Sequence, residues 1–244
     1  MNIRPIIDAG PSINFFATNR ERMLFSRVGP LHMPEAVHDE VLRKSRQDRR
    51  FASARAVLDR LPGRLLEVLS DESTTELDAV VGRIVGFTAN ERRRQAKDLG
   101  ELMVVAHAVV VAEQGHHVTV MIDAGDGRRS ATAAKRRLER LTVQGRQVSS
   151  IGLIGTISVL AKAAGSAELP DRGAMRVLYG RMRALDDGLP PIEDATVVQR
   201  AVACLLGTDR TSADSGHTTV RRWRLTWSNA GARCWGSCDY TTLV

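Results

Sequence analysis

The chain is poor in cysteine: its 244 residues include only 3 cysteines, and Cys204 stands apart from Cys234 and Cys238. Three cysteines do not make a disulfide framework, and this spacing lacks the second ligand pair of a zinc site. We therefore expect a reduced, cytoplasmic protein without a structural zinc ion.

Long apolar runs are also missing. An uncharged stretch over 148–161 contains 3 serines and 1 threonine and is too short to span a bilayer comfortably. Asp8 interrupts the first apolar run, so we expect no signal peptide. Both observations argue against a membrane-associated protein.

Lysine is scarce, with 4 residues among the 35 basic ones, and arginine supplies the rest. Only 28 residues are acidic, which leaves a net charge of +7. This excess favours an anionic partner, with nucleic acid as the first candidate.

Apolar runs alternate with helical patterns over roughly the first 190 residues. Strands are predicted at 5–10, 29–34, 64–70, 116–125 and 146–150, and helices at 11–19, 35–45, 74–87, 97–115, 126–141, 151–165 and 171–188. This alternation indicates an α/β fold with a parallel sheet and helices on both faces. We expect one domain over 1–195 with a helical insertion at about 45–97, and a separate, loosely ordered tail over 208–244.

Two of these strands end in the same four residues, Ile-Asp-Ala-Gly, at 7–10 and 122–125. Functional groups in parallel sheets gather beyond the carboxyl ends of the strands. Asp8 and Asp123 should therefore face one crevice.

Two further acids occupy suggestive positions: Glu101 begins the most apolar helix, and Glu40 lies beside core-facing valines, with Asp39 or Glu35 as alternatives. Acids that converge on one crevice repel one another unless a cation joins them. Mg²⁺ or Mn²⁺ prefers such carboxylate ligands. We predict metal ligation by Asp8, Glu101 and Asp123, with Asp126 either a ligand or a helix N-cap.

Basic and histidine side chains near these acids have more than one interpretation. Arg128 and Arg129 could hold RNA phosphates, or they could be solvated residues at the start of a helix. His107 lies mid-helix among valine and alanine, and we interpret it as a hydrogen-bonded core histidine.

The motifs, in this order, resemble the PIN-domain nucleases, the superfamily of the VapC toxins. The matching stretches are "IIDAGPSINFF", "LHMPEAVHDEVL", "DLGELMVVAHAVVVAEQG", "VTVMIDAGDGRRSA" and "GLIGTISVLAKAAG", and they cover roughly residues 3–190. In this resemblance the catalytic acids are Asp8, Glu40, Glu101 and Asp123. Gly10 stands where the family often has Ser or Thr, and Ser12 is the possible substitute.

The resemblance implies a three-layer α/β/α sandwich and a Mg²⁺- or Mn²⁺-dependent endoribonuclease, the toxin of a toxin–antitoxin pair. It also implies a homodimer and a small antitoxin partner. The alternative is a PIN-like fold without activity that binds RNA or another protein.

Overall fold

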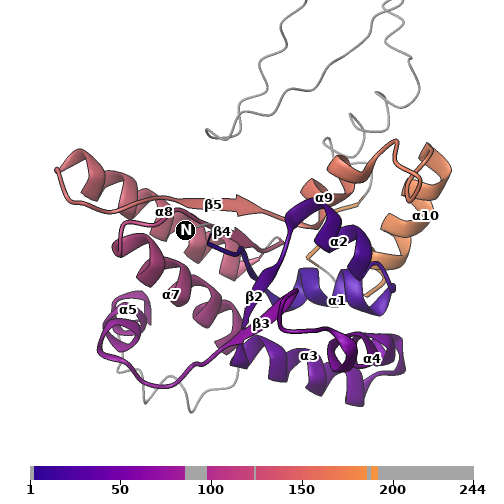
Figure 1. Cartoon of the computed structure of the whole chain (residues 1–244), viewed down its shortest axis with the longest axis horizontal. Helices are drawn as coiled ribbons and strands as arrows, with labels where there is room; N and C mark the ends of the chain where they lie inside the picture. The colour runs from indigo at the N-terminus through magenta and orange to yellow at the C-terminus, as the bar shows by residue number, and fades with distance from the viewer. Residues whose placement is uncertain (1–2, 86–97, 124, 186–187, 192–244) are drawn as a thin grey trace, which may run out of the picture. The chain divides into compact units, whose positions relative to one another are not determined.

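The computed structural model describes residues 3–85, 98–123, 125–185 and 188–191 (Figure 1). The chain divides into two compact units, Met1–Asp209 and Arg210–Val244. The second unit and the whole of the predicted tail over 208–244 lie outside the described residues, as do the cysteines.

Five parallel strands form one sheet in the order β3-β2-β1-β4-β5. The strands are β1 (Ile6–Ile7), β2 (Leu31–Pro34), β3 (Leu66–Leu69), β4 (Val118–Met121) and β5 (Ile151–Ile154). The sheet is flanked by helices, as Figure 1 shows, so the protein is a three-layer α/β/α sandwich. The fold class predicted from the alternating pattern is confirmed.

The helices follow the strands in the order expected for parallel connections. Their bounds are α1 (Ala9–Ala17), α2 (Glu21–Val28), α3 (Glu35–Gln47), the 3₁₀ turn η1 (Arg49–Phe51), α4 (Ala52–Arg60), α5 (Thr75–Val85), α7 (Leu99–Glu113), α8 (Asp126–Val143), α9 (Thr156–Ala163) and α10 (Arg172–Arg183). No helix in the described part of the chain is both long and apolar enough to cross a membrane.

Burial on both faces explains the apolar strands at the centre of the sheet. Ile6 and Ile7 of β1 are fully buried, and so are Val118, Val120 and Met121 of β4. A central parallel strand has no solvent-facing side, so its sequence reads as a continuous apolar run rather than an alternating one.

Two buried helices position the polar groups near this centre. Helix α7 lies against α5, α8 and α3 and against β1, β2, β4 and β5, and most of its residues are buried. Helix α1 is buried along almost its whole length, including the polar residues Ser12 and Asn14. Both helices start near the carboxyl edge of the sheet. Asp8 directly precedes α1 and Glu101 lies in the first turn of α7, so both acids are placed at that edge.

The structure corrects the predicted elements in the region 146–165. The strand is Ile151–Ile154 rather than 146–150, and the helix begins only at Thr156. Short apolar runs fit a buried strand and a buried helix equally well, and Gly155 separates the two here. Helix α2 was not predicted, and Asp98 does not cap α7, because it makes no side-chain capping hydrogen bond and has a positive φ of 58°.

Candidate active site

Asp8 and Asp123 follow neighbouring parallel strands at the same edge of the sheet. Ile7 of β1 pairs with Met121 of β4, and the Asp8 amide donates to the Met121 carbonyl at 3.0 Å. The prediction that the two Ile-Asp-Ala-Gly segments meet at one edge is therefore confirmed in position. The role of these aspartates as metal ligands stays a prediction.

Asp8 is a buried carboxylate with an unsatisfied oxygen. The residue is only 6% exposed, and its Oδ1 atom has no hydrogen-bond partner among the described residues. It sits at the N-cap position of α1 but makes no side-chain capping bond. The pKa of Asp8 is raised to about 7, with burial as the largest cause; the Ala9 amide opposes the rise, and the negative charges of Glu101, Glu40 and Asp123 contribute to it.

Asp123 is held by a polar network that joins three elements. Its Oδ1 accepts from the Thr156 amide at 2.7 Å, and its Oδ2 accepts from the Thr156 hydroxyl at 2.6 Å and from the Asn14 amide group at 3.1 Å. The Asn14 amide group also lies 3.2 Å from the Thr156 hydroxyl oxygen. Asn14 comes from α1 and Thr156 from the start of α9, so the end of β4 is fixed between the two helices.

The sequence interpretation missed Asn14 and Thr156 as site residues. Both side chains are fully buried, which is unusual for polar groups unless they are hydrogen-bonded. Thr156 lies within a stretch that carried the family resemblance, so a signal was present. Ser12, the possible substitute for a hydroxyl at position 10, instead donates to the Asp8 carbonyl at 2.7 Å.

Glu101 lies in the first turn of α7 and is half-buried. Burial raises its pKa, and the amide of Gly127 opposes this. The negative charges of Asp98 and Glu40 raise the pKa further, while Lys44 lowers it. The net shift of the Glu101 pKa is upward, because burial and the neighbouring negative charges outweigh the Gly127 amide and the positive charge of Lys44.

Glu40 is the acid of α3 that turns toward the site. Its side chain is 23% exposed and pairs with Lys44 one turn later at 2.9 Å, whereas the Asp39 side chain is 82% exposed. Glu35 is engaged elsewhere, because it accepts from the Asp71 amide at 2.9 Å. Of the alternatives considered, only Glu40 contributes its charge to the Asp8 environment.

Three glycines let backbone approach these carboxylates closely. A β-carbon at Gly127 would lie 2.8 Å from Glu101 Oε2, and one at Gly155 would lie 2.7 Å from Asp123 Oδ1. The corresponding position at Gly100 is 2.9 Å from Glu40 Oε2. Any larger residue at these positions would displace an acid, so the glycines are part of the site's construction.

The structure does not bring every predicted site residue into this cluster. Asp126 opens α8 with a side chain that is 72% exposed and forms an ion pair with Arg129, which is itself 75% exposed. Arg128 is half-buried, and its Nη1 donates to the Ile122 carbonyl at 2.7 Å and to the Ile154 carbonyl at 3.4 Å. Arg128 thus ties the ends of β4 and β5 together.

His107 is a hydrogen-bonded, largely buried histidine, as its mid-helix position predicted. Its Nε2 lies 2.8 Å from Asp71 Oδ1, and both side chains are 15% exposed. The other oxygen of Asp71 accepts from the Ala36 amide at 2.7 Å. This contact ties α7 to the start of α3, the helices that carry Glu101 and Glu40.

The chemistry of the donor set fits a divalent cation. Asp8 has an oxygen without a partner, and three other carboxylates raise its pKa, so a hard cation would satisfy both conditions. Within the described ranges, no three His, Cys, Asp or Glu side chains already form a group that could hold a metal ion.

No protein-family model, curated protein or solved structure gives a significant match to this chain. The candidate function therefore depends on the chemistry of the site and on the motif resemblance.

Proposed function

We propose that the chain is a PIN-like, Mg²⁺- or Mn²⁺-dependent endoribonuclease. The observation that carries the proposal is Asp8, a buried carboxylate with one unsatisfied oxygen among three like charges. A group of this kind is costly in a folded protein unless a cation joins it. The net charge of +7 suits a polyanionic substrate.

In this proposal Asp8, Glu101 and Asp123 hold the cation, and Glu40 adds negative charge at the rim. A bound Mg²⁺ or Mn²⁺ supplies activation of water and stabilisation of the leaving oxygen in phosphodiester cleavage. Asp8, with a pKa of about 7, carries a proton part of the time at neutral pH and releases it when its carboxylate becomes a ligand.

Other residues of the chain keep this arrangement in place. Asn14 and Thr156 fix the Asp123 carboxylate, as the ligand-orienting partners of a metal site do. Asp126 and Arg129 pair with each other at the exposed start of α8. The Arg129 side chain is accessible to an RNA phosphate there, whereas Arg128 already bonds two carbonyls.

The biological setting of the proposal is a cytoplasmic toxin–antitoxin pair, with a homodimeric toxin and a small antitoxin protein. This part follows from the resemblance of the motifs to the VapC toxins. A short overlapping reading frame for a small DNA-binding protein beside this gene would support it. Its absence would leave a nuclease without an antitoxin.

A second candidate is a PIN-like module that binds RNA or protein without cleaving. Two observations favour it: both oxygens of Asp123 already accept hydrogen bonds, and the described acids do not form a ready-made metal site. In this candidate the Asn14, Thr156 and Asp123 network only fastens helices to the sheet.

An RNA-cleavage assay separates the two candidates. Wild type should cut RNA with Mn²⁺ and lose this activity with a chelator. Asp8→Asn keeps the shape but removes a charge and a ligand oxygen, and it should lower cleavage by more than roughly 100-fold, since even a ligand-orienting partner costs roughly 10- to 100-fold. Asp39→Asn is the control, because that carboxylate is 82% exposed. No metal-dependent cleavage by wild type would refute the nuclease and favour the binding module.

A further inference from the structure

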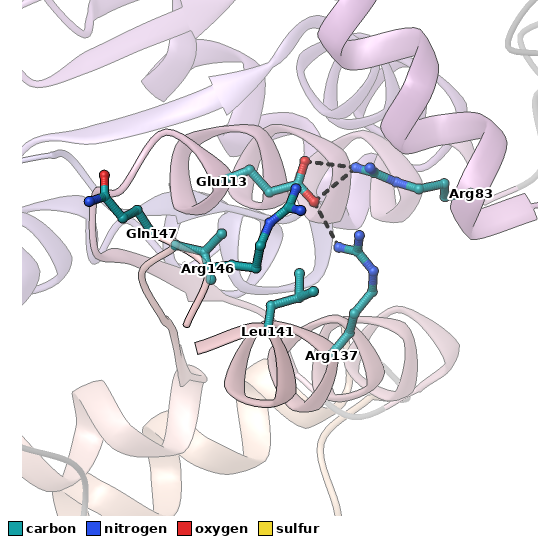
Figure 2. A pocket seen from close by; sticks show the side chains of 7 residues that line it. Arg83, Glu113, Arg137, Leu141, Arg146 and Gln147 are labelled. Carbon is teal, nitrogen blue, oxygen red and sulfur yellow. Dashed lines mark hydrogen bonds and ion pairs between the residues drawn. The ribbon is translucent and has the colours of Figure 1, made fainter. Parts of the chain in front are cut away.

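A polar pocket lies at the opposite end of helix α7 from Glu101. It has a volume of about 460 Å³ and is lined by arginines from α5, α8 and the turn after α8, together with Glu113 (Figure 2). Glu113 is the last residue of α7, so along the helix the pocket is about 18 Å from Glu101. It is thus separate from the candidate active site.

Two arginines already form hydrogen bonds with the Glu113 carboxylate. Arg83 of α5 donates to its two oxygens at 3.0 and 2.8 Å, and Arg137 of α8 donates to Oε1 at 2.7 Å. A negative charge at a helix C-terminus is unfavourable for the helix dipole, so counter-ions are expected here. One guanidinium would balance the charge of Glu113, and the second already exceeds it.

A third arginine reaches the same pocket from a turn of fixed geometry. After α8, the Gly145 amide donates to the Thr142 carbonyl at 3.0 Å and the Arg146 amide donates to the Leu141 carbonyl at 3.0 Å, which is a Schellman termination. Gly145 has a φ of 79°, which favours glycine. The turn therefore places Arg146 reproducibly, and Figure 2 shows its side chain extending toward Glu113.

The pocket has a surplus of positive charge. Three guanidinium groups face one carboxylate, and the Arg146 side chain has no ion-pair or hydrogen-bond partner within the described part of the chain. Leu141 and Val148 provide apolar wall beside these donors. Planar guanidinium groups that still have free N–H donors are well suited to phosphate oxygens.

We propose that this pocket binds a phosphate group, with Arg146 as the principal donor and Arg83 and Arg137 completing the site. The phosphate comes either from a free nucleoside monophosphate or from the backbone of bound RNA. The proposal does not depend on catalysis at Asp8, because phosphate binding here needs no metal ion.

Binding measured in the presence of a chelator tests the proposal without RNA cleavage. Inorganic phosphate and adenosine 5′-monophosphate probe the small-molecule source, and a short single-stranded RNA probes the backbone source. Arg146→Ala removes the donor, and Arg136→Ala removes an equal charge from an exposed position of α8 that does not line the pocket. Melting curves confirm that each variant is folded.

Arg146→Ala should weaken binding about tenfold, the order expected for one lost charge-assisted hydrogen bond. Arg136→Ala should leave binding by the small phosphates unchanged. Glu113→Gln should strengthen binding, because it frees both paired arginines, whereas a purely structural Glu113 would change stability and not binding.

An effect on adenosine monophosphate identifies a small-molecule site, and an effect on RNA alone identifies a backbone contact; either supports the proposal. If Arg146→Ala and Arg136→Ala bound each of the three probes equally well, the proposal would be overturned, whether or not Glu113→Gln folds.

Discussion

Helix α7 carries a glutamate in its first turn and another at its last residue, and the two have opposite pKa shifts. Burial raises the pKa of Glu101, and neighbouring acids add to the rise. Burial would also raise the pKa of Glu113, but hydrogen bonds from Arg137 and Arg83 lower it overall. The helix dipole predicts the reverse order, since it favours a negative charge at the N-terminus.

The comparison shows that close partners, rather than the helix dipole, determine these charges. A dipole contribution is typically about 0.3–1 kcal/mol, whereas a hydrogen bond to a charged group is worth about 1.5–3 kcal/mol. Glu113 has its cations within the fold. Among the described residues, Glu101 and Asp8 have acids nearby, and Lys44 pairs with Glu40. In the proposed function, a cation for the acidic end of α7, which comprises Asp8, Glu40, Glu101 and Asp123, would therefore come from solution.

The largest effect on stability is expected from Asp8→Asn without metal. The folded pKa of about 7 lies above the ordinary value of 3.8, so ionisation of Asp8 opposes folding. This cost is absent below pH 3.8, grows as the pH rises to about 7 and is constant above. Asp8→Asn should therefore gain stability relative to wild type over that window, by roughly 4 kcal/mol at pH 8.

Urea unfolding of both proteins at pH 5, 6, 7 and 8 measures this difference. If the difference in unfolding free energy between the two proteins did not change with pH, the pKa of Asp8 would be ordinary, and the neighbouring acids would not destabilise its ionised form.

A somewhat smaller effect is expected from Gly127→Ala. Its new β-carbon would lie 2.7 Å from Ile122 Cδ1 and 2.8 Å from the Glu101 carboxylate. Overpacking of this kind costs about 1–3 kcal/mol, and displacement of Glu101 should also lower metal-dependent cleavage. Gly180→Ala is the matched control, because it lies within α10 and, beyond its chain neighbours and the helix's own backbone, nothing lies within 4 Å of the added carbon. The control should gain up to about 1 kcal/mol in helix stability. Equal melting temperatures for the two variants would show that Gly127 is not needed for close approach.

The smallest effect is expected at the arginine-paired end, from Glu113→Gln. The lowered pKa of Glu113 means that its ionised form stabilises the fold above its ordinary value of 4.5 and that this contribution is lost as the pH falls through the lower folded value. At pH 7 the free energy of unfolding of the variant should be lower than that of wild type by about 1 kcal/mol. This difference should disappear as the pH falls through the folded pKa of Glu113. Glu139→Gln, a substitution at an exposed position of α8, is the control for the stability measurements at pH 7 and at acidic pH. A variant as stable as wild type at pH 7 would contradict the opposite shifts of the two glutamates.

The sequence was most informative where periodicity and position are strong. The buried strands ending at Asp8 and Asp123 were predictable, because an apolar run that stops at an acid places that acid at the carboxyl edge. Glu101 was similarly predictable from its place at the start of an apolar helix. These positions follow from chain direction alone.

Other features depend on contacts between distant parts of the chain. The network of Asn14, Thr156 and Asp123 joins residues 109 and 142 positions apart. From the sequence, Arg128 could be a phosphate ligand or a solvated residue at the start of a helix, and neither interpretation predicts the hydrogen bonds of its guanidinium to the Ile122 and Ile154 carbonyls. The segment Ile151–Ile154 was predicted to be helical, because three apolar side chains and a glycine are too few to distinguish a strand period from a helix period.

The central claim is that the acidic end lacks a cation that Mg²⁺ or Mn²⁺ supplies, and a melting curve with and without Mn²⁺ tests it most directly. Binding to the folded state at a concentration 100 times Kd adds about 2.7 kcal/mol, which corresponds to a rise of roughly 5–10 °C for a chain of this size. Wild type should show this rise, and Asp8→Asn should melt higher than wild type without metal and respond little to Mn²⁺. No rise in wild type, or an equal rise in both proteins, would contradict the account.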